Sequence, residues 1–302
     1  MVEKKWRIFT SLVVAPLGFY YVFSNVSFGM VLSNIAGSNL FYLAASYLFL
    51  FLVYVFMSLR WVSVLDEKGV DISLGDSVRY LLISLFVNLF IPFRAGDVYR
   101  GHISADNKNI MESTLLIFKD RLFDLFVLVS LTLLLALFFF ERFLMTFSVV
   151  SLVFLSMVAG MYFVFRVEEF PFFTDHYMKL RKVFVRTMNT DRKLYLVFLT
   201  VIIWVLGALR TLMVFDALGV EIGFVMACFI AFAWSLSSAI PLTPSGIGST
   251  EAIVFAFLTG LGVSEASVGS FVILNRFLVI SPPLFIGGFL YLWENLRDLF
   301  PV

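Results

Sequence analysis

The chain has 302 residues, of which 61% are hydrophobic and only 14% charged, and its mean hydropathy is +0.99. A soluble domain has too small an interior to bury that share of apolar side chains, so the composition excludes a soluble globular protein and predicts an all-α polytopic membrane protein. The formal net charge of +1 gives no indication of a nucleic-acid partner, and a single cysteine, Cys228, excludes a disulfide framework or a CxxC metal or redox motif. No cofactor or metal is expected.

Apolar runs of near-spanning length recur along the whole chain, each able to cross a hydrocarbon core of about 30 Å. The first run follows a basic start but precedes no small-residue cleavage site, so we expect a retained helix. About six full crossings are predicted, at residues 7–24, 40–59, 122–140, 143–165, 194–215 and 267–293. The expected divisions of one membrane domain, 1–302, are an N-terminal helix and outer loop (1–39), a first half (40–165), a basic cytoplasmic loop (166–193) and a second half (194–302).

The distribution of basic residues predicts the orientation, because basic loops stay in the cytoplasm. Basic residues lie on both sides of the apolar stretch 77–93, which therefore is expected to enter and leave on the same side as a re-entrant hairpin that turns near Pro92. If this stretch crossed fully, the halves would be parallel. No Lys or Arg occurs from 211 to 275, which favours a second re-entrant element over 222–262 that opens to the outside. Both termini are then cytoplasmic, in the cell membrane.

An internal repeat relates the two halves. Residues 59–72 match residues 209–222 at a constant shift of 150 positions, with identical residues at Leu59, Arg60, Val64, Asp66, Gly69, Val70 and Ile72. With small gaps the match extends to three further pairs: Ile91-Pro92 with Ile240-Pro241, Asp97 with Glu251, and Arg121 with Arg276. Since the crossings 40–59 and 194–215 are predicted to run in opposite directions, the repeat is predicted to have inverted topology.

Each half contains a helix interrupted by proline and glycine. Inverted repeats with paired broken helices are typical of transporters whose site lies between the halves near the middle of the membrane. Irregular backbone at that depth is stable only where protein buries it or where it lines a wet cavity. The residues expected to form the turns are Pro92, Gly96, Pro241, Pro244, Gly246 and Gly248.

Four motifs carry a resemblance to a known family. They are NLFIPFRAGDVYR (88–100), KDRLFDL (119–125), IPLTPSGIGSTEA (240–252) and LNRFLVISPPLFIGGFLYL (274–292). In sequence and order these resemble the lysylphosphatidylglycerol synthetase transmembrane, or flippase-like, family, over nearly the whole chain. One departure is Pro-Ser-Gly-Ile-Gly in place of the family's usual Pro-Gly-Gly-Leu-Gly. The resemblance implies a standalone member without an aminoacyl-transferase domain.

The candidate site consists of charged residues in apolar surroundings. A charge is costly there, so each residue is expected either to pair with an opposite charge or to take part in function. Arg94 and Arg100 are expected to bind a lipid phosphate, because arginine offers a fixed fork of donors, with Asp97 holding one of them. The alternative is a basic patch that meets lipid headgroups at the membrane surface. Three further residues are expected to bind the headgroup: Arg121, Glu251 and Arg276. Supporting roles are expected for Arg60, Arg210, Asp120, Asp124 and Asn275. We expect Arg121 to pair with Asp120 or Asp124 along its helix.

In the second half, Arg276 with Asn275 is the counterpart of that group. Glu251 is expected to pair with Arg121 or Arg276, and it is also a candidate for proton uptake. Arg60 and Arg210 are related by the repeat, and Arg210 either contacts substrate or pairs with Asp216. A helix that begins near Ser249 would direct its amides at an anion.

The leading functional hypothesis is a lipid flippase or transporter that moves an amphiphile with an anionic headgroup, such as a phospholipid or a polyprenyl-phosphate-linked lipid. The alternatives are an embedded phosphatase of polyprenyl diphosphates, a channel, and an accessory subunit for lipid glycosylation. An enzyme would need a nucleophile or general base beside the arginines, and His102 and His176 both lie in or near loops. A homo-oligomer or a lipid-modifying enzyme is a possible partner.

Overall fold

The computed structural model describes residues 20, 24, 27–91, 94–104, 110–138, 152, 155, 185, 189–239 and 246–299, and all the regular structure in them is helical. This confirms the all-α class. The elements are α2 (Phe28–Ala36), α3 (Leu40–Asp66), α4 (Leu74–Phe90), α5 (Ala95–Ser104), α6 (Ile110–Phe138), α9 (Lys193–Ala217), α10 (Phe224–Ala239), α11 (Ser249–Gly260), α12 (Glu265–Pro282), the π-helix η3 (Pro283–Gly287) and α13 (Gly288–Leu299).

Three stretches of the described chain are long and apolar enough to cross a membrane: Leu40–Asp66, Lys193–Ala217 and Glu265–Asn295. They correspond to three of the predicted crossings and support a membrane location. The predicted crossings 7–24 and 143–165 lie almost wholly outside the described residues, as does the basic loop 166–193. The count of six crossings and the two re-entrant hairpins therefore stay predictions.

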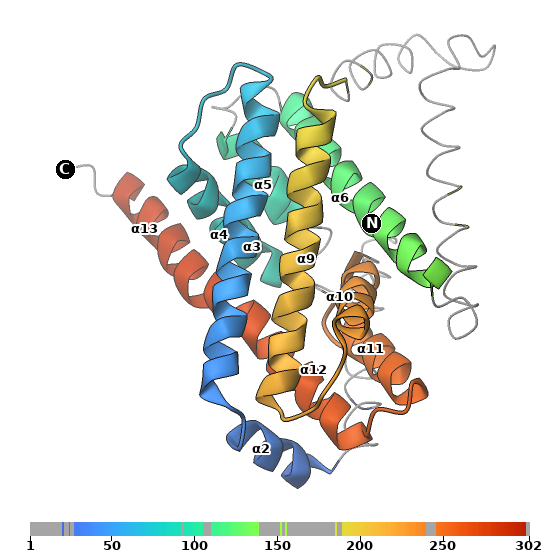
Figure 1. The fold of residues 1–302 in the computed structure, drawn as a ribbon. Helices are drawn as coiled ribbons and strands as arrows, with labels where there is room; N and C mark the ends of the chain where they lie inside the picture. Colours follow the sequence, from blue (N-terminus) through green and yellow to red (C-terminus); the bar gives the residue numbers. More distant parts are fainter. Residues whose placement is uncertain are drawn as a thin grey trace, which may run out of the picture.

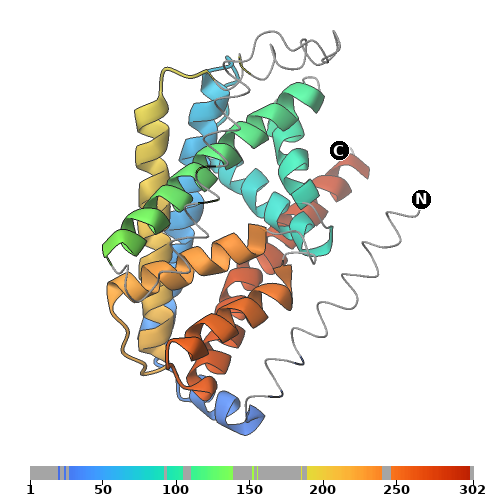
Figure 2. The same ribbon diagram turned by 90° about the vertical axis from the view of Figure 1, so that its right-hand side faces the viewer.

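Helices α3 and α9 lie side by side and run in opposite directions (Figures 1 and 2). At one end, the amide of Asn39, just before α3, donates to the carbonyl of Ala217, the last residue of α9, at 2.9 Å. At the other end, Arg192, just before α9, lies 2.6 Å from Asp66, the last residue of α3. The two helices that begin the repeats are therefore antiparallel.

The glycines of the repeat end these helices in the same way. Gly69 and Gly219 have φ angles of 69° and 68°, in the left-handed region that glycine adopts without strain. The following amides, of Val70 and Val220, each donate back to the carbonyl five residues earlier, at 3.2 and 3.0 Å. Helices α4 and α10 begin directly after these turns, so the order α3–α4–α5–α6 is repeated as α9–α10–α11–α12.

Two local features differ from the sequence-based expectation. Residues 28–36, expected within a loop, form α2, which binds α12 through a hydrogen bond from Asn34 to Ser270 at 3.1 Å. The predicted crossing 267–293 belongs to a longer continuous helical stretch, α12–η3–α13, in which a π-helical turn begins at the second of two consecutive prolines. Gly287 in that turn packs so closely on α4 that a Cβ there would lie 2.3 Å from the carbonyl oxygen of Leu82.

Candidate functional site

A buried cluster of charged residues connects α3, α5, α6 and α9, with Arg60 on α3 at its centre. Arg60 is 1% exposed and contacts two carboxylates of α6, with its Nε 2.8 Å from Asp120 and its Nη1 3.1 Å from Asp124. The same Nη1 donates to the Thr200 hydroxyl of α9 at 3.0 Å. These three acceptors among the described residues come from other helices, so Arg60 links α3 to α6 and α9.

Two further arginines complete this first cluster. Arg100 of α5 is buried, with Nη2 3.3 Å from Asp120 and its guanidinium 4.7 Å from the centre of the Trp61 ring. Arg121 of α6 lies 2.9 Å from Asp97 and 3.6 Å from Asp124. Of the two predicted partners of Arg121, Asp124 is found here, whereas Asp120 binds Arg60 and Arg100.

Helix α4 holds Asp97 in place. The Oδ1 atom of Asp97 accepts from the Ser84 hydroxyl at 3.0 Å and from the Asn88 amide at 3.1 Å. Gly96 permits this close approach, because a Cβ there would lie 2.2 Å from the Ser84 carbonyl oxygen. The expectation that Asp97 pairs with Arg94 or Arg100 is wrong: the side chain is turned toward α4 and α6, and its ion pair is with Arg121.

Arg94 differs from the other arginines of this half. It is exposed, precedes α5 and has a φ of 55°, which is uncommon for a residue with a side chain. Within the described part of the chain it makes no hydrogen bond or ion pair. The residues after the break therefore differ in their contacts: Arg100 contacts Asp120 and Trp61, whereas Arg94 is exposed and lies near Asp97 and Arg121 without an ion pair to Asp97. Pro92 lies outside the described residues.

The second half repeats one of these ion pairs. Glu251 of α11 binds the Nε of Arg276 on α12, and the Arg276 guanidinium lies 5.1 Å from the centre of the Trp234 ring. Of the two predicted partners of Glu251, Arg276 is therefore correct. Asp97 with Arg121, and Glu251 with Arg276, join the equivalent helices of the two halves, α5 to α6 and α11 to α12.

Helix α11 begins at Ser249, as predicted, but its first turn already has a carboxylate. The other oxygen of Glu251 accepts from the Gly248 amide at 2.7 Å. Gly246 and Gly248 have φ angles of 67° and 84°, which supports their predicted role in the turn. The Gly248 amide at the start of this helix is therefore bonded to Glu251. Pro241 and Pro244 lie outside the described residues.

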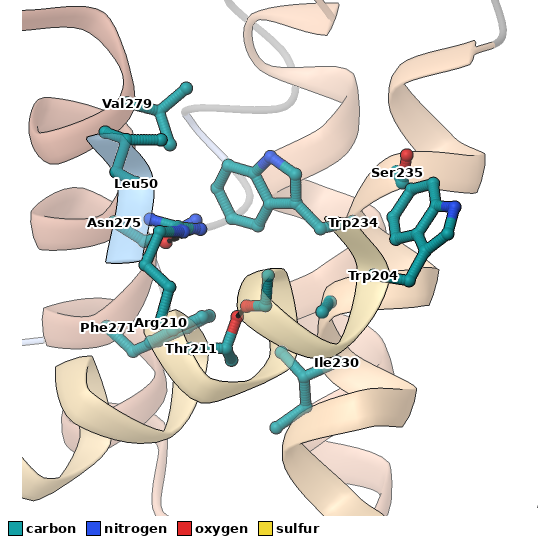
Figure 3. Close-up of a pocket in the computed structure, with 12 residues that line it drawn as sticks. Leu50, Trp204, Arg210, Thr211, Ile230, Trp234, Ser235, Phe271, Asn275 and Val279 are labelled. Carbon is teal, nitrogen blue, oxygen red and sulfur yellow. Dashed lines mark hydrogen bonds between the residues drawn. The ribbon is translucent and has the colours of Figure 1, made fainter. Parts of the chain in front are cut away.

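Arg210 of α9 lies in a separate pocket of about 230 Å³ (Figure 3). Its Nη2 donates to the Asn275 Oδ1 of α12 at 2.7 Å, and its Nη1 has no hydrogen-bond partner among the described residues. The alternative pairing of Arg210 with Asp216 is not found. The pocket lies between α9, α10 and α12, with Trp204 and Trp234 among its walls.

Sequence reasoning missed several residues that support the site. Lys119 is fully buried, 2.7 Å from Glu67, which also accepts a hydrogen bond from Thr190. Burial alone would raise the pKa of Glu67, but the bonds from Lys119 and Thr190 lower it below its ordinary value. The role of Asn88 had a signal in the sequence, since a side-chain amide in an apolar helix requires a partner. In the described part of the chain, no three His, Cys, Asp or Glu residues are grouped as metal ligands.

Comparisons with known proteins agree with the motifs. The family model described as the lysylphosphatidylglycerol synthase TM region matches residues 8–287. A UPF0104 membrane protein of Methanocaldococcus jannaschii is 26% identical over 215 residues, which are 65% of this chain and 88% of that protein. A UPF0104 membrane protein of Pyrococcus horikoshii is 30% identical over 115 residues, 38% of this chain and 34% of the relative.

Proposed function

This chain belongs to the lysylphosphatidylglycerol synthase TM region family, and from that premise we propose that it moves a lipid with an anionic, phosphate-bearing headgroup between the leaflets of the membrane. Helical membrane structure and a membrane-lipid context follow from the family and the fold. The movement of lipid between leaflets is the part that we add as a proposal. The transported class is proposed to be phospholipid or polyprenyl-phosphate-linked lipid.

The observation that carries the proposal is arginine that no carboxylate pairs with. In the first cluster the acids Asp97, Asp120 and Asp124 pair with Arg60, Arg100 and Arg121, while Arg94 lies near the cluster without an ion pair among the described residues. In the second half the described partners are Arg210, Arg276 and Glu251. Arginine stays charged at membrane depth and matches phosphate geometry, so an arginine without a carboxylate partner in apolar surroundings favours an anionic ligand.

The antiparallel repeat supports alternating exposure of that ligand to the two sides. Halves of opposite direction can exchange equivalent conformations, which opens a central site first to one face and then to the other. The end of α3 and the start of α9 share one face, where Lys68, Arg192 and Lys193 occur. Under the positive-inside tendency we propose that this face is cytoplasmic.

A leaflet-exchange assay tests the proposal. Purified protein would be reconstituted into liposomes with traces of headgroup-labelled phosphatidylglycerol, a glycosylated lipid or a polyprenyl phosphate, and an impermeant reagent would destroy label in the outer leaflet only. We expect loss of label to continue beyond one half for an anionic lipid, and to slow with Arg94→Ala and Glu251→Gln. Arg192→Gln is the matched control, because Arg192 makes a half-exposed ion pair that contributes little.

The same liposomes distinguish the alternative functions. If label stays half-protected for every lipid while phosphate is released from a polyprenyl diphosphate, the embedded phosphatase replaces the transporter. If neither activity occurs until a glycosyltransferase is added, the accessory role replaces both. Exchange that is equal in wild type and in the two site variants would contradict the proposed site.

A further inference from the structure

We propose that the Arg210 pocket binds one singly charged phosphodiester, the headgroup phosphate of a glycerophospholipid, with the guanidinium of Arg210 as its counter-ion. The inference rests on the proposed function and makes it more specific, because it assigns a ligand class to one pocket. It follows from a comparison of Arg210 with its repeat counterpart, Arg60.

The three acceptors that neutralise Arg60 are absent around Arg210. Asp120 and Asp124 precede and follow Arg121 on α6, and the match of Arg121 with Arg276 makes their equivalents Asn275 and Val279. Thr200, the third acceptor, is equivalent to Leu50. All three replacements, Asn275, Val279 and Leu50, line the Arg210 pocket. The arginine is thus retained, while both carboxylates and the hydroxyl have become one amide and two hydrocarbon side chains.

The same substitution pattern creates space. Trp61, the residue after Arg60, is fully buried and lies against Arg100, whereas the residue after Arg210 is the much smaller Thr211, which lines the pocket. A volume of about 230 Å³ is several times the ~30 Å³ that one water occupies in the liquid. A phosphate group with the first carbons of its esters fits such a volume.

The charge of the pocket determines the charge of its occupant. Arg210 is 9% exposed, and among the described residues no carboxylate forms an ion pair with it. A buried cation without a counter-ion is unfavourable, and arginine does not lose its proton to relieve this. One uncompensated guanidinium, with its Nη1 free to donate, matches one negative charge, which a phosphodiester carries and a phosphomonoester or diphosphate exceeds.

The walls favour a lipid over a free ion. Apart from Arg210 and Asn275, the side chains that line the pocket are mostly aliphatic or aromatic, and Figure 3 shows Trp234 beside the guanidinium and Trp204 at the opposite side of the pocket. Such walls gain from contact with the glycerol and upper acyl carbons of an amphiphile, which inorganic phosphate lacks.

The test replaces Asn275 of the second half by aspartate, the residue found at the equivalent position 120 of the first half. Asn275→Asp is isosteric and already lies at hydrogen-bond distance from Arg210, so it neutralises the pocket without a change of shape. Asn295→Asp makes the same chemical change at an exposed residue of α13 and is the matched control. Equilibrium binding of dioctanoyl phosphatidylglycerol to the full chain in a neutral detergent would be measured for wild type, Asn275→Asp, Arg210→Gln and the control, with melting temperatures to confirm folding.

We expect Asn275→Asp and Arg210→Gln to weaken binding by about tenfold or more, as for loss of a hydrogen bond to a charged group, and the control to bind as wild type does. Inorganic phosphate and farnesyl monophosphate complete the comparison and are expected to bind more weakly. Unchanged affinity in both pocket variants overturns the proposal. Tighter binding of the monophosphate overturns the single-charge assignment, and equal binding of inorganic phosphate overturns the lipid assignment.

The proposed function can fail separately. If wild type binds phosphatidylglycerol through Arg210 but does not exchange lipid between leaflets, the pocket stands and the transport proposal falls. If wild type exchanges lipid between leaflets but Arg210→Gln does not change binding, the transport proposal stands and the pocket proposal falls.

Discussion

Asp97 and Glu251 occupy equivalent positions in the two halves, and each forms an ion pair with the equivalent arginine of the next helix, Arg121 or Arg276. Both carboxylates are buried, so each pair holds a short helix against a longer one in surroundings where an unpaired charge is unfavourable.

We predict that Asp97→Asn and Glu251→Gln each lower the free energy of unfolding by about 3 kcal/mol, because each removes a buried carboxylate from its ion pair with a partly buried arginine. Unfolding in mixed micelles of increasing denaturing detergent would measure the change. Asp66→Asn, which removes an exposed partner of Arg192, is the control and should cost less than about 1 kcal/mol. Equal effects at the three positions would show that the buried pairs do not stabilise the fold.

Arg60 and Arg210 should respond differently to the same substitution. Arg60→Gln leaves Asp120 and Asp124 short of a shared counter-ion, and is predicted to destabilise the protein by about 3–5 kcal/mol. Arg210→Gln removes a cation without a carboxylate partner among the described residues, and is predicted to leave stability unchanged or to raise it. The same micelle titration, without added anionic lipid, compares the two. A large loss of stability from Arg210→Gln would mean that the pocket arginine is structural.

Gly96→Ala should separate α4 from α5. The added Cβ would lie 2.2 Å from the Ser84 carbonyl oxygen, a backbone atom that cannot move alone, so we expect a cost of about 1–3 kcal/mol and slower lipid exchange. Gly29→Ala in α2 is the control, since a Cβ there meets no atom within 4 Å and alanine favours a helix. A melting temperature equal to that of wild type would contradict the close packing of α4 on α5.

Equivalent loops of the two repeats should lie on opposite sides of the membrane. Asp71 and Glu221 are matched by the repeat, are exposed, and follow the ends of the antiparallel helices α3 and α9. In a background with Cys228 replaced by Ala, an impermeant maleimide should label Asp71→Cys only from the cytoplasmic side and Glu221→Cys only from outside. Labelling of both from one side would exclude inverted topology.

The repeat was the part of the structure most accessible from the sequence. Because Arg, Asp and Gly recur at a fixed shift, the sequence predicted the equivalence of Asp97 with Glu251 and of Arg121 with Arg276, and it included Arg276 as a partner of Glu251. An alignment of the two halves shows directly which positions are equivalent, so these pairs could be predicted without a structure.

The sequence was a poorer guide to which helix each side chain would contact. The spacing of Arg94, Asp97 and Arg100 suggested a local group, but Asp97 is turned toward Ser84 and Asn88 on α4, and its ion pair is with Arg121. The sequence does not indicate the acceptors of Arg60, because Asp120, Asp124 and Thr200 are all distant from it along the chain. The pocket beside Arg210 depends on the acceptors that surround Arg60 and are replaced around Arg210, and the structure is needed to show which residues those acceptors are.

The unequal surroundings of Arg60 and Arg210 also bear on why the halves are joined in one chain. An antiparallel dimer of a half-length protein would carry two identical arginine sites, and any substitution would alter both at once. Once the halves are fused, one site can keep its carboxylates as a rigid pivot, while the other loses them and becomes able to accept a ligand. Covalent linkage thus allows the two halves of a symmetric scaffold to acquire different tasks.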